Sequence, residues 1–491
     1  MTARYKPYPE YKPSDVEWIG DVPEHWWVFG GKRIFRQRIE RAQVDDEQLA
    51  ATQQYGVIPQ SLYMKENGQK VVLALKGTDS FRHVEENDFV ISLRSFQGGI
   101  EHSGYSGCVS PAYTVLDAVK QIDFRYYRYL LKSTPYICAL QSSTDSLREG
   151  KSITYEQFGQ ISLPLLPMEE QHAIAAFLDR ETGKIDRMIG KQERMIELLK
   201  EKRQAVISNA VTKGIDPTAP MKDSGIDPTA PMKDSGIEWL GQIPEHWKAL
   251  QLRHCLNGME QGKSPSCENR MTEEGEWGVL KSGCVNRGEF NQNEHKALPS
   301  TAEPFSEYEV KRGDLLMSRA SGSRDLIGSV GYVSEVKSRL LLSDKTFRLK
   351  TKPLADKLFL SHEMSSQVVR RQIELAINGA EGLANNITQS SIRSFYIALP
   401  PIDEQKEIVQ FLERETAKID HLIAKAEQAI ELMKERRTAL ISAAVTGKID
   451  VSTYASTHAG RRDGSSNAYC VTDEAPEMMA AEEQAEYRVK E

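Results

Sequence analysis

The sequence predicts an α+β protein in which two globular mixed α/β domains are separated by two long antiparallel helices, with an internal pseudo-two-fold repeat. Two repeated stretches carry this prediction. EWIGDVPEHW at 17–26 returns as EWLGQIPEHW at 238–247, and the segment 170–212 returns at 404–446. The intervening inserts, about 28–160 and 248–395, are not visibly repeated. We call the repeated stretches the frame. A duplicated frame that holds two different inserts indicates one task performed on two targets.

The repeated segments 170–212 and 404–446 have a helical pattern. Pro167 and acidic residues suit the start of the first helix, and Lys213 and Gly214 suit its end. Apolar residues recur every three or four positions, which gives one narrow stripe per helix. Such a stripe needs a partner along its length, and the other copy is the obvious one. The predicted seam joins Leu178, Ile185, Ile189, Ile196 and Leu199 to Leu412, Ile419, Ile423, Ile430 and Met433. The alternative is two independent helices, each packed on its own domain.

The expected domain boundaries follow the repeats. Between the halves, GIDPTAPMKDS occurs twice in tandem, and its prolines block a continuous helix, so it is a spacer. The Ser-, Ala- and Glu-rich tail is expected to be disordered. The predicted segments are the N-terminal motif with the first insert domain (1–166), the central helix (167–213), the spacer (214–235), the second insert domain (236–400), the distal helix (401–448) and the acidic tail (449–491).

Composition excludes several classes of protein. No apolar run approaches the roughly 20 residues that span a membrane, and the N-terminus has no signal-peptide core. The six cysteines form no CxxC pair, which predicts reduced thiols, a cytoplasmic location and no metal site. A net charge of −7 argues against attraction of the whole molecule to nucleic acid, but it leaves room for a local basic groove.

Catalytic signatures are missing from the sequence. The segment 258–264 ends like a phosphate-binding loop, but it is one residue too short and has Asn257 where the first glycine belongs. His25 and His246 occupy matching positions beside tryptophans, where packing is a better explanation than general-base catalysis. We therefore expect no catalytic residues in this chain.

Both inserts contain side chains suited to binding nucleic acid. Arg and Lys contact guanine edges and phosphates, and Gln and Asn contact adenine, although any one of these residues is more commonly a solvated polar group. Arg94 and Arg319 follow matching strand-like runs, so at least one of them is expected to contact DNA. The candidates are Arg82, Arg94, Ser95, Gln97, Gly98, Arg148 and Lys151 in the first insert, and Lys263, Ser264, Lys281, Arg287, Arg319, Ser321, Arg324, Asn385 and Asn386 in the second.

The motif EW-[IL]-G-x-[IV]-PEHW, the helix EQ…FL…RET-x-KID and the two-insert layout resemble the specificity (S) subunit of type I restriction–modification systems. The resemblance extends to about residue 450. It implies that each insert is a target recognition domain reading one half of a split DNA site. The helix pair would set the spacing and dock two methyltransferase (M) subunits, which restriction (R) subunits then join. It also implies a non-catalytic role in a phage-defence complex that cleaves DNA and methylates adenine.

The same resemblance assigns S-adenosylmethionine, ATP and Mg to the partner subunits, so this chain is expected to bind no cofactor. Two other functions remain possible from the sequence. A coiled-coil scaffold without DNA readout is disfavoured because it would need no divergence between the inserts. A fragment with its own nuclease or methylase is disfavoured by the missing motifs. The number of spacer copies is expected to change the half-site spacing, unless the spacer simply loops out.

Overall fold

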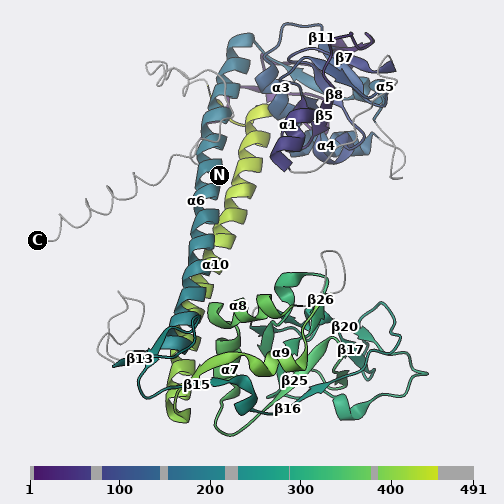
Figure 1. Ribbon diagram of the computed structural model, residues 1–491. Helices are drawn as coiled ribbons and strands as arrows, with labels where there is room; N and C mark the ends of the chain where they lie inside the picture. Colours follow the sequence, from purple (N-terminus) through teal and green to yellow (C-terminus); the bar gives the residue numbers. More distant parts are fainter. Residues whose placement is uncertain are drawn as a thin grey trace, which may run out of the picture. The chain divides into compact units, whose positions relative to one another are not determined.

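The computed structural model describes residues 5–67, 80–143, 153–215, 231–286, 288–377 and 385–451. The chain forms two compact units (Figure 1). The first unit contains Met1–Arg187 and Met433–Glu491, and the second contains Met188–Leu432. Among the described helices, none has an apolar stretch sufficient to cross a membrane.

The two long helices are α6 (Met168–Lys213) and α10 (Ile402–Val445). Both follow a proline, and a glycine with positive φ lies just beyond each C-terminal end. Gly214, with a φ of +83°, directly follows α6, and Gly447, with a φ of +73°, lies two residues after the end of α10. Glycine adopts this left-handed conformation without steric cost, so it terminates a helix well. The helix boundaries therefore agree closely with the sequence expectation.

Within each unit α6 and α10 lie side by side and run antiparallel (Figure 1). In the first unit, Arg437 Nε lies 2.8 Å from Asp186 Oδ1. In the second unit, Arg203 Nε lies 2.9 Å from Asp420 Oδ1. Asp186 and Arg203 are each 234 positions before Asp420 and Arg437, so the same pair of frame positions forms both contacts.

Each insert is built on a four-stranded antiparallel sheet with the same strand order. In the first unit the order is β4 (Phe35–Arg38), β11 (Thr114–Ala118), β8 (Phe89–Ile91) and β9 (Glu101–His102). In the second it is β16 (Leu256–Gln261), β25 (Thr346–Thr351), β21 (Leu315–Ser318) and β23 (Val330–Tyr332). The two inserts therefore have the same sheet topology, although their sequences show no visible repeat.

Smaller elements surround these sheets. The first unit adds β1 (Tyr11–Pro13), β2 (Asp21–Pro23), β3 (Trp27–Gly30), β5 (Leu49–Thr52), β6 (Gly56–Pro59), α1 (Gln60–Asn67), β7 (Arg82–Val84), α2 (Ser95–Gly98), β10 (Gly107–Val109), α3 (Phe124–Leu130), α4 (Thr134–Ser142), α5 (Tyr155–Gln160) and β12 (Ser162–Leu165). The second adds β13 (Met232–Asp234), β14 (Gln242–Pro244), β15 (Lys248–Gln251), β17 (Gly278–Leu280), β18 (Val285–Asn286), β19 (Glu289–Phe290), β20 (His295–Ala297), β22 (Ala320–Ser321), β24 (Leu340–Leu341), α7 (Lys357–Met364), α8 (Gln367–Ala376), β26 (Asn385–Asn386), α9 (Gln389–Ser394) and β27 (Tyr396–Leu399).

The strand β13 corrects one predicted boundary. Met232–Asp234 pairs with Gln242–Pro244, just as Tyr11–Pro13 pairs with Asp21–Pro23 in the first half. The end of the second spacer copy is therefore part of the folded frame, because its backbone completes a sheet with the tryptophan motif. Residues 216–230 and the tail 452–491 lie outside the described residues.

The predicted seam residues differ in burial along the helices. Leu178, Ile185 and Ile196 are buried, and so are their repeat equivalents Leu412, Ile419 and Ile430. The flanking positions Ile189, Leu199, Ile423 and Met433 are partly buried.

The partners of Leu412 differ from those expected. Leu412 shares a core cluster with Ile207, Ala210 and Val211 at the C-terminal end of α6. It therefore packs beyond the span Leu178–Leu199 that the sequence assigned to the seam. The apolar stripe identifies the buried face, but an even stripe does not fix the axial register of two helices.

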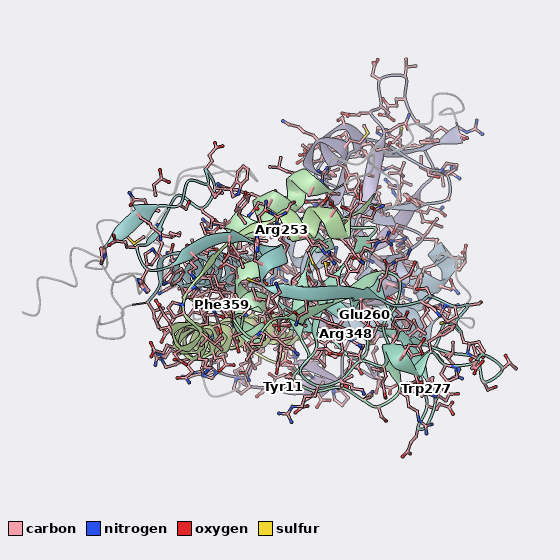
Figure 2. The ribbon with its side chains drawn as sticks, turned by 60° about the horizontal axis from the view of Figure 1, so that its bottom comes forward. Tyr11, Arg253, Glu260, Trp277, Arg348 and Phe359 are labelled. Atoms are coloured by element: carbon pink, nitrogen blue, oxygen red, sulfur yellow. The ribbon has the colours of Figure 1, made fainter. Side chains whose placement is uncertain are left out.

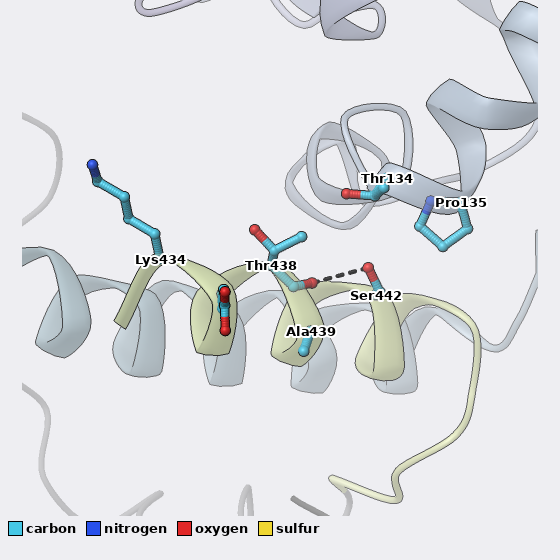
Figure 3. A pocket seen from close by; sticks show the side chains of 7 residues that line it. Thr134, Pro135, Lys434, Thr438, Ala439 and Ser442 are labelled. Atoms are coloured by element: carbon cyan, nitrogen blue, oxygen red, sulfur yellow. Dashed lines mark hydrogen bonds between the residues drawn. The ribbon is translucent and has the colours of Figure 1, made fainter. Parts of the chain in front are cut away.

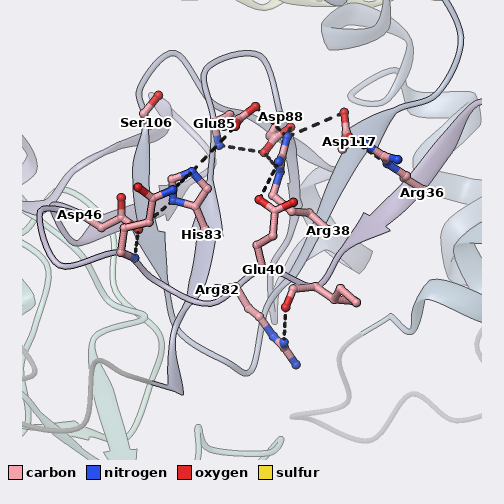
Figure 4. A network of polar contacts seen from close by, with 12 residues as sticks. Arg36, Arg38, Glu40, Asp46, Arg82, His83, Glu85, Asp88, Ser106 and Asp117 are labelled. Atoms are coloured by element: carbon pink, nitrogen blue, oxygen red, sulfur yellow. Dashed lines mark hydrogen bonds and ion pairs between the residues drawn. The ribbon is translucent and has the colours of Figure 1, made fainter.

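A polar cluster stabilises the first sheet (Figure 4). Arg38 is 8% exposed, and its guanidinium contacts Asp88 at 2.7 Å, Glu85 at 3.0 Å and Glu40 at 3.1 Å. Glu40, His83 and Glu85 offer metal-ligand atoms within 4.8 Å of one another. Because Arg38 already pairs with the carboxylates of both Glu40 and Glu85, we interpret the cluster as an ion-pair network.

Candidate DNA-binding interface and helix joints

In each half, the two repeated motifs bind each other. Trp26 Nε1 donates to Glu170 Oε1 at 3.0 Å, and His25 Nε2 lies 2.8 Å from Glu170 Oε2. In the second half, Trp247 Nε1 donates to Glu404 Oε1 at 2.9 Å, and His246 Nε2 lies 2.8 Å from Glu404 Oε2. The histidines therefore anchor the frame to the start of each long helix through hydrogen bonds. Their side chains are 50% and 55% exposed, so their role is structural, but they are not packed inside the protein as expected.

The glutamine that follows each of these glutamates joins the helix to the insert. Gln171 Oε1 accepts from the backbone N–H of Asp123 at 2.8 Å, and Gln405 Oε1 accepts from that of Asp356 at 2.7 Å. Asp123 and Asp356 are the N-caps of α3 and α7. The Glu-Gln pair occurs in both copies of the frame, so its duplication was already a sequence signal for a structural joint.

The two halves differ where the insert meets the opposite long helix. In the second unit, Gln204 Nε2 donates to the Ser365 carbonyl at 2.8 Å, and Ser208 Oγ accepts from the Gln367 N–H at 3.0 Å. In the first unit, Ser442 Oγ instead donates to the carbonyl of Thr438 in its own helix at 2.9 Å (Figure 3). An open groove of about 560 Å³ lies there, lined by Thr134, Pro135, Lys434, Glu435, Thr438, Ala439 and Ser442.

Four of the first-insert candidates cluster at α2. Arg94 and Gln97 are exposed there, and Gly98 is half-buried. Ser95 is only 1% exposed, and its hydroxyl accepts from the Ser92 N–H at 2.8 Å, so it stabilises the turn and does not face a ligand. Including Ser95 among the DNA contacts was therefore wrong.

The remaining first-insert candidates do not join this group. Arg82 lies on β7, where its Nη1 donates to the Ile39 carbonyl at 3.1 Å. Arg148 and Lys151 lie outside the described residues.

In the second insert, β22 and β26 bring several candidates together. Their pairing places Ser321 opposite Asn385, and Asn386 opposite Ala320, which follows Arg319. Arg319 Nη1 donates to the Asp344 carbonyl at 3.3 Å. The hydroxyl of Ser264 bonds the Asp344 carboxylate. These pairings bring together residues that are more than 60 positions apart in the sequence, although Asn385 is itself only 9% exposed.

The other second-insert candidates have partners of their own. Lys263 Nζ lies 4.0 Å from the centroid of the Phe305 ring, a cation–π contact. Lys281 Nζ lies 3.6 Å from Glu294 Oε2. Arg324 is exposed, and its Nη2 donates to the Glu374 carbonyl at 3.3 Å. Arg287 lies outside the described residues.

The second sheet contains an ion pair between neighbouring strands. Arg348 Nη1 on β25 lies 2.8 Å from Glu260 Oε2 on β16 (Figure 2). The Arg348 side chain is only 12% exposed, so this arginine stabilises the sheet and is poorly placed to bind a ligand.

The helix pair of the second unit presents an apolar strip to solvent. Large exposed side chains are Met188, Met195 and Leu198 on α6, and Leu422 and Leu432 on α10. Met188 and Leu198 are repeat equivalents of Leu422 and Leu432. A two-fold axis that exchanges two antiparallel helices is perpendicular to both, so equivalent residues lie on the same face of the pair. This face has the apolar character of a protein-binding surface.

Comparisons with known proteins agree with this architecture. Residues 244–432 match the family model for the type I restriction modification DNA specificity domain. The EcoEI specificity subunit of Escherichia coli is 30% identical over 207 residues, which cover 42% of this chain and 34% of that subunit. The MjaVIII specificity subunit of Methanocaldococcus jannaschii is 25% identical over 382 residues, which cover 75% of this chain and 80% of that subunit.

One solved structure shares the fold. A chain from a structural study of complex assembly and conformational transition in the type I restriction–modification system aligns with a TM-score of 0.65 at 14% identity. The alignment covers 87% of this chain and 99% of that one.

Together, the duplicated frame, the paired helices and these matches make the chain similar to the specificity subunits of type I restriction–modification systems. The matched DNA specificity domain lies in the second half of the chain, at residues 244–432. The chain spans about a third of the EcoEI subunit, at 34%, and most of the MjaVIII subunit, at 80%.

Proposed function

We propose that each insert domain reads one half of a bipartite DNA site, so that the chain gives a type I restriction–modification complex its sequence specificity. The observation that carries this proposal is the combination of a repeated frame with unlike inserts. Each insert contains its own four-stranded sheet, and the two sheets have the same strand order, yet their exposed polar loops differ. A scaffold without DNA readout would need the helices only.

In this proposal, α6 and α10 set the distance between the two half-sites. A helix rises 1.5 Å per residue and is stiff, so a packed pair maintains a fixed separation. The ion pairs Asp186–Arg437 and Arg203–Asp420, together with the buried apolar stripe, oppose sliding of one helix along the other.

The exposed apolar face of the helix pair supports docking of two methyltransferase subunits. Because Met188 and Leu198 have equivalents in Leu422 and Leu432, any partner that fits one half of this face finds a second, equivalent half. Restriction subunits would join this core in the cytoplasm. S-adenosylmethionine, ATP and Mg would be bound by the partners, and the chain itself would be non-catalytic.

The direct test is to map methylated adenines across the genome with and without this chain. The proposal predicts a two-part methylated motif that disappears when the chain is deleted and returns when it is restored. An unchanged pattern of methylation after deletion would contradict the proposal. Methylation or cleavage of DNA by the purified chain alone would favour the enzyme alternative.

A further inference from the structure

A β-hairpin in the first unit packs directly against α2, the short helix that holds Arg94 and Gln97 at its ends. The hairpin consists of β5 and β6, and its tip is formed by Gln53, Gln54 and Tyr55. A Cβ atom added at Gly98 would lie only 2.6 Å from Gln53 Nε2 and 2.7 Å from its Cδ. The Gln53 side chain therefore rests on the one position of α2 that has no side chain.

Hydrogen bonds hold both sides of this contact in place. Lys132 Nζ donates to the Gln53 carbonyl at 2.8 Å and to Glu101 Oε2 at 2.6 Å. Glu101 is 2% exposed, so this lysine links the hairpin tip to the interior of the domain. On the other side, Gln141 Nε2 of α4 donates to the Phe96 carbonyl of α2 at 2.9 Å. The hairpin tip and α2, which are distant in the sequence, thus form a single surface that these hydrogen bonds hold in place.

The turn of the hairpin is also fixed. Thr52 Oγ1 donates to the Gly56 carbonyl at 3.0 Å and accepts from the Tyr55 N–H at 3.0 Å. Gly56 has a φ of +73°, and a Cβ there would lie 2.7 Å from the His102 carbonyl oxygen on β9. The tip is therefore held against the sheet, and its exposed side chains extend from a rigid base.

The side chains exposed on this surface suit the reading of base edges. Gln54 and Gln97 are exposed, as is Arg94, and Tyr55 is 40% exposed. A glutamine amide has one donor and one acceptor group, which match the N7 and N6 groups of adenine in the major groove. An arginine beside them can bind guanine or phosphate.

We propose that the hairpin tip and α2 form one DNA-reading surface, on which Gln54 and Gln97 contact adenine edges of the first half-site and Gly98 is a positioning residue. The inference rests on the proposed function and adds the hairpin, which no sequence motif marks. Gly98 acts through Gln53, because a Cβ at this position would force the Gln53 side chain off its place on α2.

The experiment uses the full chain assembled with its methyltransferase subunits, and it maps the methylated motif for Gln54→Ala and Gln97→Ala. The matched control is Gln121→Ala, an exposed glutamine in the same unit on the connection between β11 and α3. Each test variant should relax one adenine position in one half of the motif, with loss of discrimination on the order of 10- to 100-fold. The control should leave the motif unchanged.

Two further variants separate base reading from loss of structure. Gln97→Glu has nearly the same shape but only acceptor groups, so it should shift preference at one position from adenine toward cytosine. Gly98→Ala should weaken recognition of the first half-site, and Gln53→Ala in the same chain should restore it because the crowded atoms are gone.

Unchanged motifs for both Gln54→Ala and Gln97→Ala would overturn the inference. A uniform loss of binding to all sequences, or relaxation of the other half-site, would also overturn it. Exchange of the whole insert distinguishes this failure from failure of the proposed function. If that exchange changes one half of the motif while the glutamine variants do not, only the reading surface is wrong.

Discussion

Glu170 accepts a hydrogen bond from the indole of Trp26, with Nε1 and Oε1 3.0 Å apart, and this contact joins the two repeated motifs of the first half. Trp26 is fully buried, so its N–H needs a partner inside the protein. The same contact recurs between Trp247 and Glu404 at 2.9 Å. The duplicated motifs therefore form the same structural contact in both halves.

The two joints should differ in strength. Glu170 also accepts from the hydroxyl of Tyr8, whose pKa is raised well above its usual value by burial and by this carboxylate. Hydrogen bonds to charged groups contribute about 1.5–3 kcal/mol each. We therefore expect Glu170→Ala to lower the free energy of unfolding more than Glu404→Ala, as measured by urea denaturation. Glu169→Ala, an exposed neighbour, is the control. Equal losses for the two joints would contradict the assignment.

The helix seam makes a symmetric prediction about stability. Ile196 and Ile430 are repeat equivalents with exposures of 8% and 7%. Truncating a buried isoleucine to alanine costs about 2–5 kcal/mol, depending on the cavity left. Ile196→Ala and Ile430→Ala should therefore destabilise the chain by similar amounts in denaturant melts. A loss below about 0.5 kcal/mol for either variant would show that its side chain is not in the seam.

The exposed apolar face predicts a binding defect without a folding defect. Leu198 and Leu432 are 43% and 58% exposed, so Leu198→Lys and Leu432→Lys should leave the melting temperature nearly unchanged. Both should weaken co-purification of methyltransferase subunits, because a lysine ammonium is costly to bury in an apolar interface. Glu193→Lys, an exposed change elsewhere on α6, is the matched control. Normal assembly of both leucine variants would show that the methyltransferase subunits dock on a different surface.

Glu363 predicts a dependence of stability on pH. This carboxyl group is fully buried on α7, and burial raises its pKa to about 8. Its Oε1 accepts from the Ala398 N–H at 3.2 Å, and among the described residues Oε2 has no hydrogen-bond partner. The folded state therefore holds a proton that the unfolded state releases above its ordinary pKa of 4.5.

The sign of this effect follows from proton linkage. Because the folded state binds more protons between pH 4.5 and 8, stability falls as pH rises through that window, by up to ~1.4 kcal/mol per pH unit. Glu363→Gln should remove this slope, so its advantage over the parent chain in thermal melts should be larger at pH 8 than at pH 5. The neighbouring His362 has a pKa lowered to about 4 by burial, and it destabilises the fold only as pH falls below its usual 6.5. A difference between parent and variant that is constant with pH would contradict the assignment.

The frame of this fold could be predicted because its sequence occurs twice in the chain. The helix boundaries, the antiparallel pairing and the anchoring role of His25 and His246 all follow from matched positions. The common sheet of the inserts could not be predicted. Strands of three to six residues, such as β8 and β25, carry too little pattern to show which of them pair.

The candidate site was predicted less well for a related reason. Polar residue types suggest contacts with DNA, but burial decides which of them are accessible, as Ser95 shows. The hairpin tip at Gln53–Tyr55 has no distinguishing motif, and its importance appears only in its contact with Gly98.

The spacer was expected to change the distance between half-sites, and the structure favours the alternative. A Cβ at Gly214 would lie 3.5 Å from the Trp247 side chain, and Met232–Asp234 pairs with the strand just before that tryptophan. Both flanks of the spacer are therefore fixed to one frame within the second unit. An extra copy between two fixed points costs little, so its removal is expected to leave the gap unchanged.

The central claim is that each insert reads its own half of the DNA site, and replacement of residues 28–160 with the insert of a related specificity subunit tests it most directly. Sequencing of methylated adenines in the resulting strain should show a new sequence in one half of the motif, with the other half unchanged. A change in both halves, or in neither, would contradict the account.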